Sequence, residues 1–375
     1  MNSILILIIS IFLFLGCNDK KTIQTSRDLE KYILDLPQVE VENNNVNIDR
    51  EKVYSLLSRI DNSIPDKLFL IDYSDWSIYM AKKDGTLLDK KGGQGRGPGE
   101  FLGINDLRTY KNENVLQIFD KKLKRLTYYN IKEASFELDY TVNLPNYEQY
   151  YLQTVFKNNG KNVGVFRVLR QHRGAVENKI YLHYLDEEFN KKEKILETEG
   201  AELIEVERFE GSKRFEENMF GNETVWSYDD GKFVYGNAAE LHFMVYNFDT
   251  DNFSEFRVSD IPENKNTSEI TELWNKRYKR IFSLTPEYET YFKERKFLPY
   301  FNSIYANNDF LYIPLANYGN EIGYIIRLNK ETEKLERIEV PSNFFMKGVN
   351  QSGIYGTITE DSFEGNIMVS IMEFK

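Results

Sequence analysis

The sequence predicts an all-β protein, a six-bladed β-propeller with four antiparallel strands in each blade. Three observations support this prediction: the composition, a hairpin pattern that recurs six times, and the spacing between the repeats. The 375 residues include 25 Tyr and 26 Phe but only 3 His, and aromatic enrichment is typical of strands. The length allows a large core, in one repetitive domain or in two or three separate domains.

Each repeat begins with a hairpin, in which two alternating apolar runs flank a polar turn. The turns contain Asn-Gly, Asp-Gly, Asn-Asp or Ser-Gly, which connections between two strands favour. A third alternating run follows each hairpin and, in most repeats, a fourth. The six hairpins cover residues 53–72, 104–120, 151–167, 224–236, 301–314 and 344–358.

The spacing of the repeats predicts four-stranded blades with two insertions. Second strands lie 47, 47, 70, 77 and 44 residues apart, counted from Phe69, Leu116, Val163, Phe233, Phe310 and Ile354. A period of about 45 residues is that of four-stranded propeller blades. In the longer gaps, we expect helices over residues 265–296, because this segment is rich in the helix formers Glu, Lys and Arg. Pro286 stands where a helix would begin. Residues 197–223 predict a short strand and a loop.

The sixth repeat reaches Lys375 after its third strand, so its fourth strand must come from elsewhere in the chain. Residues 31–37 (KYILDLP) share the pattern and the Leu-Pro ending of residues 139–145 (DYTVNLP), the fourth strand of the second repeat. We therefore expect residues 31–37 to pair beside the C-terminal strand and close the ring. Closure removes the open sheet edges that would otherwise pair with other chains.

The N-terminus predicts export. Residues 4–15 form an apolar run that is too short to span a bilayer but suits the core of a signal peptide. Cys17, the only cysteine, directly follows Gly16 and resembles the lipidated cysteine of a bacterial lipobox. We expect a signal peptide over residues 1–17, lipidation of Cys17, a flexible tether over 18–29 and a single propeller domain over 30–375. The protein would then be anchored in the cell envelope, at the outer membrane; the alternatives are an uncleaved anchor or an ordinary signal peptide.

Charge and histidine spacing exclude several function classes. A net charge of −11 argues against nucleic acid or anionic headgroups as partners, because basic stripes recruit those surfaces. His172, His183 and His242 lack the spacing of metal ligands, and no Gly-x-Ser-x-Gly motif is present. We expect no metal and no cofactor.

Residues 92–101 (GGQGRGPGEF) contain five glycines and a proline and must form a tightly shaped loop. No Gly-Lys-Ser/Thr follows and the next segment reads as a strand, so a phosphate-binding turn is excluded. We expect the glycines to allow close backbone approach, Glu100 to accept from backbone amides and Phe101 to insert between blades, with Arg96 available to a ligand. The structural residues of this loop are Gly95, Gly97, Pro98, Gly99, Glu100 and Phe101.

The heptad Gly95–Phe101, together with the six repeats and the lipobox-like start, resembles the six-bladed β-propeller lipoproteins of Bacteroidetes. That family carries a G-x-G-P-G-E-[FY] loop between its first and second blades. A weaker similarity extends to NHL-type propellers. The resemblance implies a fold and a location in the cell envelope, and it implies no particular reaction.

Polar and charged residues end the second strands or enter the loops that follow them. If the register is right, they surround one mouth together with the Gly-rich loop and both insertions. Guanidinium groups there would hold an anionic or polyhydroxylated ligand through forked hydrogen bonds; the alternative is a solvated loop whose charges pair locally. The candidate ligand-binding residues are Asp72, Trp76, Arg96, Asp120, Arg167, Arg170, His172, Arg173 and Tyr318.

The sequence favours a binding module for a glycan, a peptide or a partner protein of the cell envelope, acting at the insertion-bearing face. The alternative is an enzyme similar to NHL-like propellers, a lyase or hydrolase with a charged site at the same mouth. A structural or assembly role for the whole rim is a third interpretation. No catalytic residue is assigned. The fold does not decide the function, because propellers host many unrelated activities.

Overall fold

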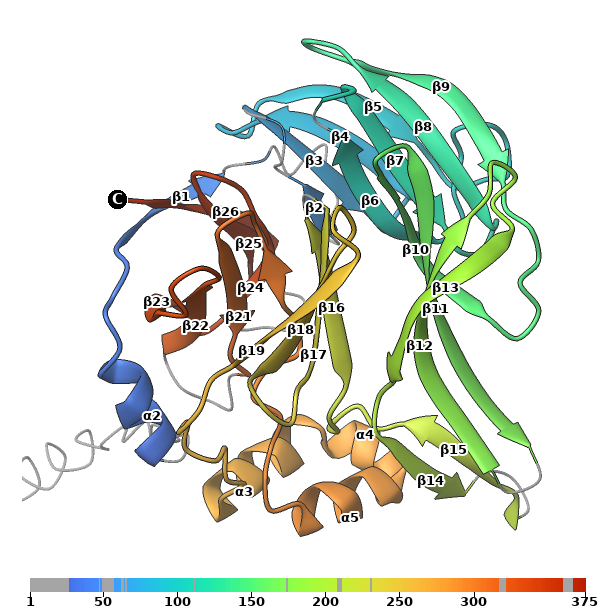
Figure 1. Cartoon of the computed structure of the whole chain (residues 1–375). Coiled ribbons are helices and arrows are strands. Elements are labelled where there is room, and N and C mark those ends of the chain that lie inside the picture. Colours follow the sequence, from blue (N-terminus) through green and yellow to red (C-terminus); the bar gives the residue numbers. More distant parts are fainter. Residues whose placement is uncertain are drawn as a thin grey trace, which may run out of the picture.

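The computed structural model describes residues 27–46, 48, 57–61, 64, 66–110, 112–172, 175–207, 211–229, 231–316, 322–359 and 367–375. Six four-stranded antiparallel sheets form the blades of a propeller (Figure 1). All six predicted hairpins are present as the first two strands of a blade. The predicted fold class is therefore confirmed.

The strands follow one another round the ring in chain order, apart from the closing strand. Blade 1 is formed by β2 (Leu57–Asp61), β3 (Lys67–Asp72), β4 (Ser77–Lys82) and β5 (Leu87–Gly92). Blade 2 is formed by β6 (Ile104–Tyr110), β7 (Val115–Asp120), β8 (Arg125–Ile131) and β9 (Phe136–Asn143). Blade 3 is formed by β10 (Tyr151–Asn158), β11 (Lys161–His172), β12 (Ala175–Leu185) and β13 (Lys191–Glu199).

The second half of the ring repeats this order. Blade 4 is formed by β16 (Thr224–Asp229), β17 (Lys232–Asn237), β18 (His242–Asn247) and β19 (Asn252–Arg257). Blade 5 is formed by β20 (Tyr305–Ala306), β21 (Phe310–Pro314), β22 (Ile322–Asn329) and β23 (Leu335–Pro341). Blade 6 is formed by β24 (Phe344–Val349), β25 (Gly353–Thr359), β26 (Ile367–Phe374) and β1 (Val41–Val46).

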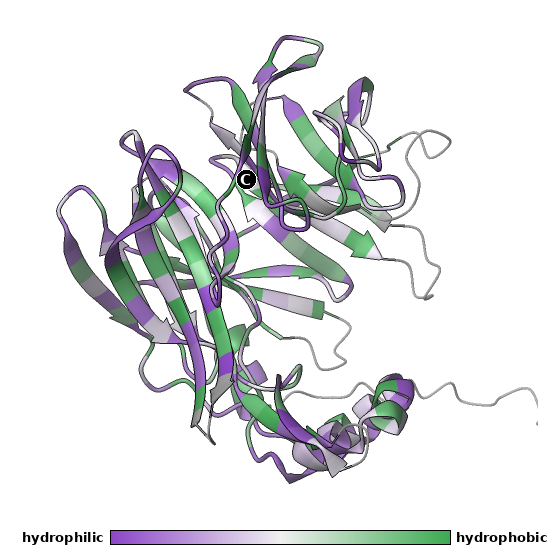
Figure 2. Cartoon of the chain, turned by 90° about the vertical axis from the view of Figure 1, so that its right-hand side faces the viewer, coloured by the Kyte–Doolittle hydropathy of each residue, from purple (hydrophilic) through white to green (hydrophobic). Residues whose placement is uncertain are grey.

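Burial follows the position of a strand within its blade. Second strands such as β3 and β7 are buried along almost their whole length, because both of their faces pack against neighbouring blades. Fourth strands such as β9 and β19 are mostly exposed. Hydrophobic and hydrophilic residues accordingly alternate along many of the strands in Figure 2. The core is thus a series of apolar seams between blades.

An N-terminal strand closes the ring, as predicted, but it is not the predicted segment. β1 pairs antiparallel with β26, with Val41 opposite Phe374 and Val46 opposite Val369. The assignment of a strand to residues 31–37 is wrong, because α2 (Arg27–Leu34) occupies most of that segment. Leu29 and Ile33 lie four residues apart on one face of this helix and are buried among residues of blades 4 and 5.

The predicted helical insertion is confirmed as α3 (Ser268–Arg277), α4 (Lys279–Leu284) and α5 (Pro286–Glu294). The hydroxyl of Thr267 accepts from the amide of Ile270 at 3.3 Å and caps α3, and Pro286 is the first residue of α5. The other insertion is a hairpin of β14 (Leu203–Glu207) and β15 (Lys213–Glu217), where a strand and a loop were expected.

The two insertions share one small core, and we call them together the insertion layer. Ile204 and Phe220 pack in it against Phe282 and Phe292. The insertion layer and α2 lie at the same end of the view in Figure 1. We call this end of the propeller, where second strands lead to third strands and fourth strands lead to the next blade, the insertion face. The opposite end, with the turns between first and second strands, is the turn face.

Candidate functional site

The central channel of the propeller is a cavity of about 1510 Å³. All six blades contribute to its lining, chiefly through their first strands. At the turn face it is lined by turn residues that include Glu113, Asp309 and Gln351. Toward the insertion face it is lined by Arg167 and Glu223. The cavity therefore follows the axis of the propeller from one face toward the other.

Amide and aromatic side chains dominate the uncharged part of the channel lining. Nine aromatic residues of the described part of the chain contribute, among them Tyr110, Trp226 and Tyr228. Such rings offer flat apolar faces with polar edges, which suits stacking against sugars or peptide bonds. The amide side chains that line it, as far as the chain is described, are those of Asn105, Asn112, Gln153, Asn302, Asn307, Asn308, Asn350 and Gln351.

A partly buried charge pair lies on β6 in the channel wall. The Nη2 atom of Arg108 is 3.7 Å from Oδ2 of Asp106, which also accepts a hydrogen bond from Thr154. The guanidinium lies 5.6 Å from the ring centroids of both Phe156 and Tyr228. Its Nε atom is buried without a hydrogen-bond partner among the described residues. Arg108 is thus fixed by a carboxylate and two rings and keeps one donor unused.

A second cluster lies where the channel meets the insertion layer. Nη1 of Arg167 is 2.9 Å from Oε2 of Glu217, and Glu223 lies close enough to interact electrostatically with both. Burial raises the pKa of Glu223, Arg167 opposes this rise, and Glu217 adds to it. Glu223 is therefore a carboxyl group with a raised pKa that lies near the ion pair of Arg167 and Glu217.

Replacing Glu223 with glutamine is expected to stabilise the protein near pH 8 and to have little effect near pH 4. The pKa of Glu223 in the folded chain lies above its ordinary value of 4.5. The stability contributed by the protonated form is therefore present below 4.5 and is lost as pH rises through the folded pKa. Denaturant unfolding at both pH values measures the difference. Glu188→Gln, which changes an exposed carboxylate, is the control, and equal destabilisation by Glu223→Gln at both pH values would contradict the prediction.

The two aspartates that end second strands accept hydrogen bonds from nearby groups of the protein, although Oδ2 of Asp72 is buried without a partner among the described residues. Both are fully buried. Oδ2 of Asp120 accepts from the amides of Leu102 at 2.7 Å and Gly103 at 3.1 Å, and Oδ1 accepts from the amide of Leu123 at 2.8 Å. Oδ1 of Asp72 accepts from the amide and hydroxyl of Ser74 at 2.8 and 2.6 Å. The observed contacts of both residues fix loops.

The Gly-rich loop has the contacts of a structural element. Oε2 of Glu100 accepts from the amide of Gly97 at 2.7 Å, and a Cβ at Gly95 would lie only 2.0 Å from the same oxygen. Gly99 has a φ of +76°, which a residue with a side chain adopts only with strain. Arg125 donates to the carbonyl of Arg96 at 3.1 Å and to that of Glu100. The loop is therefore held from inside and from the neighbouring blade.

The remaining candidate residues do not form one cluster. The ring of Trp76 lies 4.8 Å from that of Tyr73 in the turn after β3. The Arg96 side chain is exposed and has no partner among the described residues, and Arg170 binds Gln149 at 2.6 Å and also Glu177. Of all the candidates with described side chains, Arg167 alone lines the central channel. The remaining predictions fall outside the described part of the chain: they concern the positions of Arg173, Tyr318 and Cys17 and the side chain of His172.

Sequence reasoning missed the channel residues on the first strands. Asp106, Arg108 and Lys157 all lie on strands that were predicted correctly. The available signal was the charge inside them, since the first strand of the second repeat reads INDLRTY and holds two charged residues where a blade needs apolar contacts. First strands of a propeller face the axis, so polar residues there indicate a channel lining.

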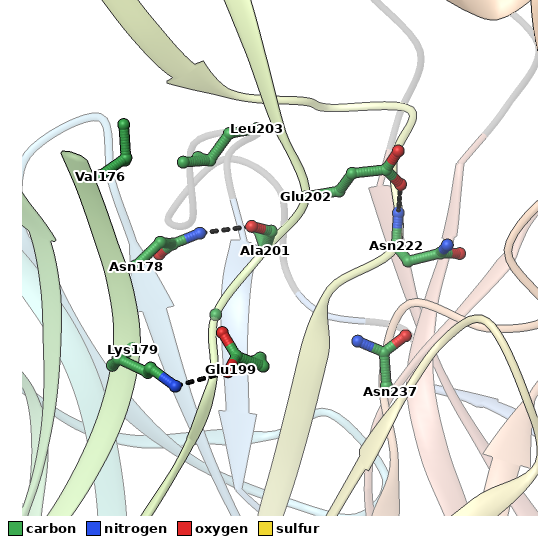
Figure 3. A pocket seen from close by; sticks show the side chains of 10 residues that line it. Val176, Asn178, Lys179, Glu199, Ala201, Glu202, Leu203, Asn222 and Asn237 are labelled. Atoms are coloured by element: carbon green, nitrogen blue, oxygen red, sulfur yellow. Dashed lines mark hydrogen bonds and ion pairs between the residues drawn. The ribbon is translucent and has the colours of Figure 1, made fainter. Parts of the chain in front are cut away.

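A smaller pocket of about 430 Å³ opens on the insertion face beside β14 (Figure 3). Asn178 donates to the carbonyl of Ala201, and Glu202 accepts from the amide of Asn222 at 2.8 Å. Lys179 pairs with Glu199 at its edge. Most of its polar groups therefore bind each other, which makes it a weaker candidate than the channel. Within the described residues, no three His, Cys, Asp or Glu side chains gather as metal ligands.

Comparison with known proteins identifies the architecture. Residues 52–340 match the model of a family described as a 6-bladed β-propeller, DUF5128. A Bacteroides fragilis protein described as exported is 12% identical with a TM-score of 0.57, over 90% of this chain and 95% of that one. A DUF4221 family member from Bacteroides vulgatus is also 12% identical, with a TM-score of 0.54 over 91% of this chain and 99% of that one. At these identities the likeness concerns the fold alone, and no curated protein matches the sequence.

Proposed function

Because the chain belongs to the DUF5128 family of six-bladed β-propellers, we propose that it is a binding module of the cell envelope whose ligand occupies the central channel. The observation that carries this proposal is the cavity of about 1510 Å³ with its aromatic and amide lining. Ligand sites are commonly concave, largely preformed and lined by rings with a few fixed polar groups. The channel has these properties, whereas most of the candidate residues at the insertion face are engaged in local contacts.

The charges in the channel favour an uncharged, polyhydroxylated ligand, that is, a glycan. Arg108 is paired with Asp106, Arg167 with Glu217, Lys157 with Glu113 and Arg327 with Glu336. A charged ligand would have to break such pairs and leave a partner uncompensated, which is costly. A sugar instead needs amide donors and acceptors and an aromatic face, both of which the lining supplies.

Trp226 provides the direct test, because it lines the channel and stacks on Phe233 with ring centroids 5.7 Å apart. We expect a bound oligosaccharide to change tryptophan fluorescence and raise the melting temperature. Trp226→Phe should abolish the fluorescence change and weaken binding only about threefold, since phenylalanine keeps a smaller ring and a whole stacked ring contributes ~0.5–1.5 kcal/mol beyond the area it buries. The matched control is Trp76→Phe, which alters the ring at the insertion face. Loss of the response in Trp76→Phe alone would place the ligand at that face instead.

One observation favours an enzyme as the second candidate. Glu223, beside Arg167, holds its proton to higher pH than an ordinary glutamate, and a carboxyl group of this kind in a cavity is suited to general acid catalysis. A lyase or hydrolase would then act on the same ligand. Turnover of an oligosaccharide that survives in Glu223→Gln would exclude this role, whereas binding without turnover in that variant supports it.

The proposed location is the outer membrane, through lipidation of Cys17. The order of an apolar run, a small residue and a sole cysteine supports it, as does the similarity in fold to a Bacteroides protein described as exported. No helix among the described residues is long and apolar enough to cross a membrane.

A further inference from the structure

The insertion layer carries a basic run, Lys276, Arg277, Lys279 and Arg280, where α3 ends and α4 begins. All four residues are exposed. No carboxylate of the described residues forms an ion pair with any of them, although carboxylates pair with many other cations of the chain. Residues 265–296 hold eight Lys or Arg against five Glu, in a chain whose net charge is −11. The positive charge is therefore local to the helical insertion, since residues 197–223 of the other insertion hold nine Glu against three Lys or Arg.

An apolar side chain accompanies this charge. Leu284 at the end of α4 is 73% exposed, more than any other large hydrophobic residue that the structure describes. It lies four residues after Arg280, so both side chains project from the same face of α4. Phe297 and Leu34 are also about half exposed, just after α5 and at the end of α2. Basic and apolar residues on one helical surface are the composition of segments that lie on a membrane.

The chain enters the propeller at this same face. Leu29 and Ile33 of α2 pack with Leu241 in the loop after β17 and with Tyr300 at the end of the helical insertion. Ten residue steps separate Arg27, the first described residue, from Cys17. A fully extended chain covers ~3.5 Å per residue, so a lipid on Cys17 would keep α2 within about 35 Å of the bilayer.

We propose that the insertion face docks on anionic phospholipid headgroups through the basic run, with Leu284 reaching into the interface. The inference rests on the proposed lipid anchor, which supplies the first attachment, while the basic run supplies the second that stable membrane binding requires. The argument from net charge against anionic headgroups does not apply to a local patch, because screening confines each charge to about 10 Å.

Docking in this orientation assigns separate roles to the two ends of the channel. The insertion face meets the membrane, and the turn face points away from it. The channel lining at the turn face includes Asn112, Glu113, Asn308, Asp309 and Gln351. A soluble ligand would therefore enter the channel past these residues.

The test uses the full chain, purified from membranes and reconstituted into phosphatidylcholine vesicles with or without phosphatidylglycerol. A fluorophore is attached to the cysteine of Ser283→Cys on α4 or of Ser352→Cys in the turn between β24 and β25. A lipid with a spin label at the level of the headgroup quenches the fluorophore when the two are in contact. We expect strong quenching at position 283 in anionic vesicles only, and none at position 352. Each Lys or Arg at an anionic surface contributes about fivefold to binding. The double variant Arg277→Gln, Arg280→Gln should thus lower the ratio of docked to undocked protein by about 25-fold.

Lys192→Gln with Lys194→Gln is the matched control, since it removes the same charge from exposed lysines at the turn-face end of β13. Vesicle association without quenching at position 283, or equal quenching at both positions, overturns the docking and leaves the anchor intact. Failure to associate with any vesicle overturns both. The chain without an added cysteine should not react with the fluorophore. If it does react, the Cys17 thiol is unmodified. That result would overturn the lipid anchor and the orientation argued from it.

Discussion

Replacing Phe101 with alanine is expected to lower the free energy of unfolding by about 3–5 kcal/mol. Phe101 is completely buried in the seam between blades 1 and 2. Its cluster contains Phe69 and Ile78 from blade 1 and Ile118 and Tyr129 from blade 2. Removing the ring leaves a cavity between two blades that cannot close without moving one against the other, so both transfer and cavity costs apply.

Urea unfolding of the two chains measures this difference, with Phe345→Ala as the matched control. Phe345 lies on β24 and is 48% exposed, so its replacement should cost no more than about 1 kcal/mol. If Phe101→Ala costs as little as the control, the seam is not held by this ring. In that case, placing Phe101 between the blades would not explain the shape of the Gly-rich loop.

The blades were predictable because their signals are local. Turn residues and alternating apolar runs mark each hairpin within about 20 residues. The closing strand was not predictable in this way, because β1 reads VENNNV and lacks an apolar pattern. Its position is set by backbone pairing to β26, which only the complete ring provides.

The error at residues 31–37 has a specific cause. Tyr32, Leu34 and Leu36 alternate as in a strand, whereas Leu29 and Ile33 have the spacing of a helix. Both periods are present in the same ten residues. The helix forms because Leu29 and Ile33 find a buried surface on blades 4 and 5, a contact between segments about 200 residues or more apart.

The candidate site was predicted less well than the fold, because a channel lining is a property of the closed ring. Asp106 and Thr154 lie on different blades and meet only when their first strands converge on the axis. The sequence did indicate which residues end second strands, and Asp72 and Asp120 are found there. It did not show whether their carboxylates turn outward to a ligand or inward to the backbone.

Asp120→Ala is expected to destabilise the protein by about 3–5 kcal/mol, more than Asp72→Ala. Hydrogen bonds to a charged acceptor contribute ~1.5–3 kcal/mol each, and donors left unsatisfied in a buried site add to the loss. The carboxylate of Asp120 accepts from three backbone amides, whereas that of Asp72 accepts from one amide and one hydroxyl. Water can replace only part of this, because Asp120 is fully buried.

Urea unfolding of both variants ranks the two aspartates, and Asp120→Asn refines the comparison. Asparagine keeps the size of the side chain and one acceptor oxygen, so it should retain part of the stability that alanine loses. The amides of Leu102 and Gly103 should also exchange hydrogen faster in Asp120→Ala, because their shared acceptor is gone. Equal costs for Asp72→Ala and Asp120→Ala, with unchanged exchange at both amides, would mean that the Gly-rich loop holds its shape without Asp120. The carboxylate would then be available for a ligand, as the sequence suggested.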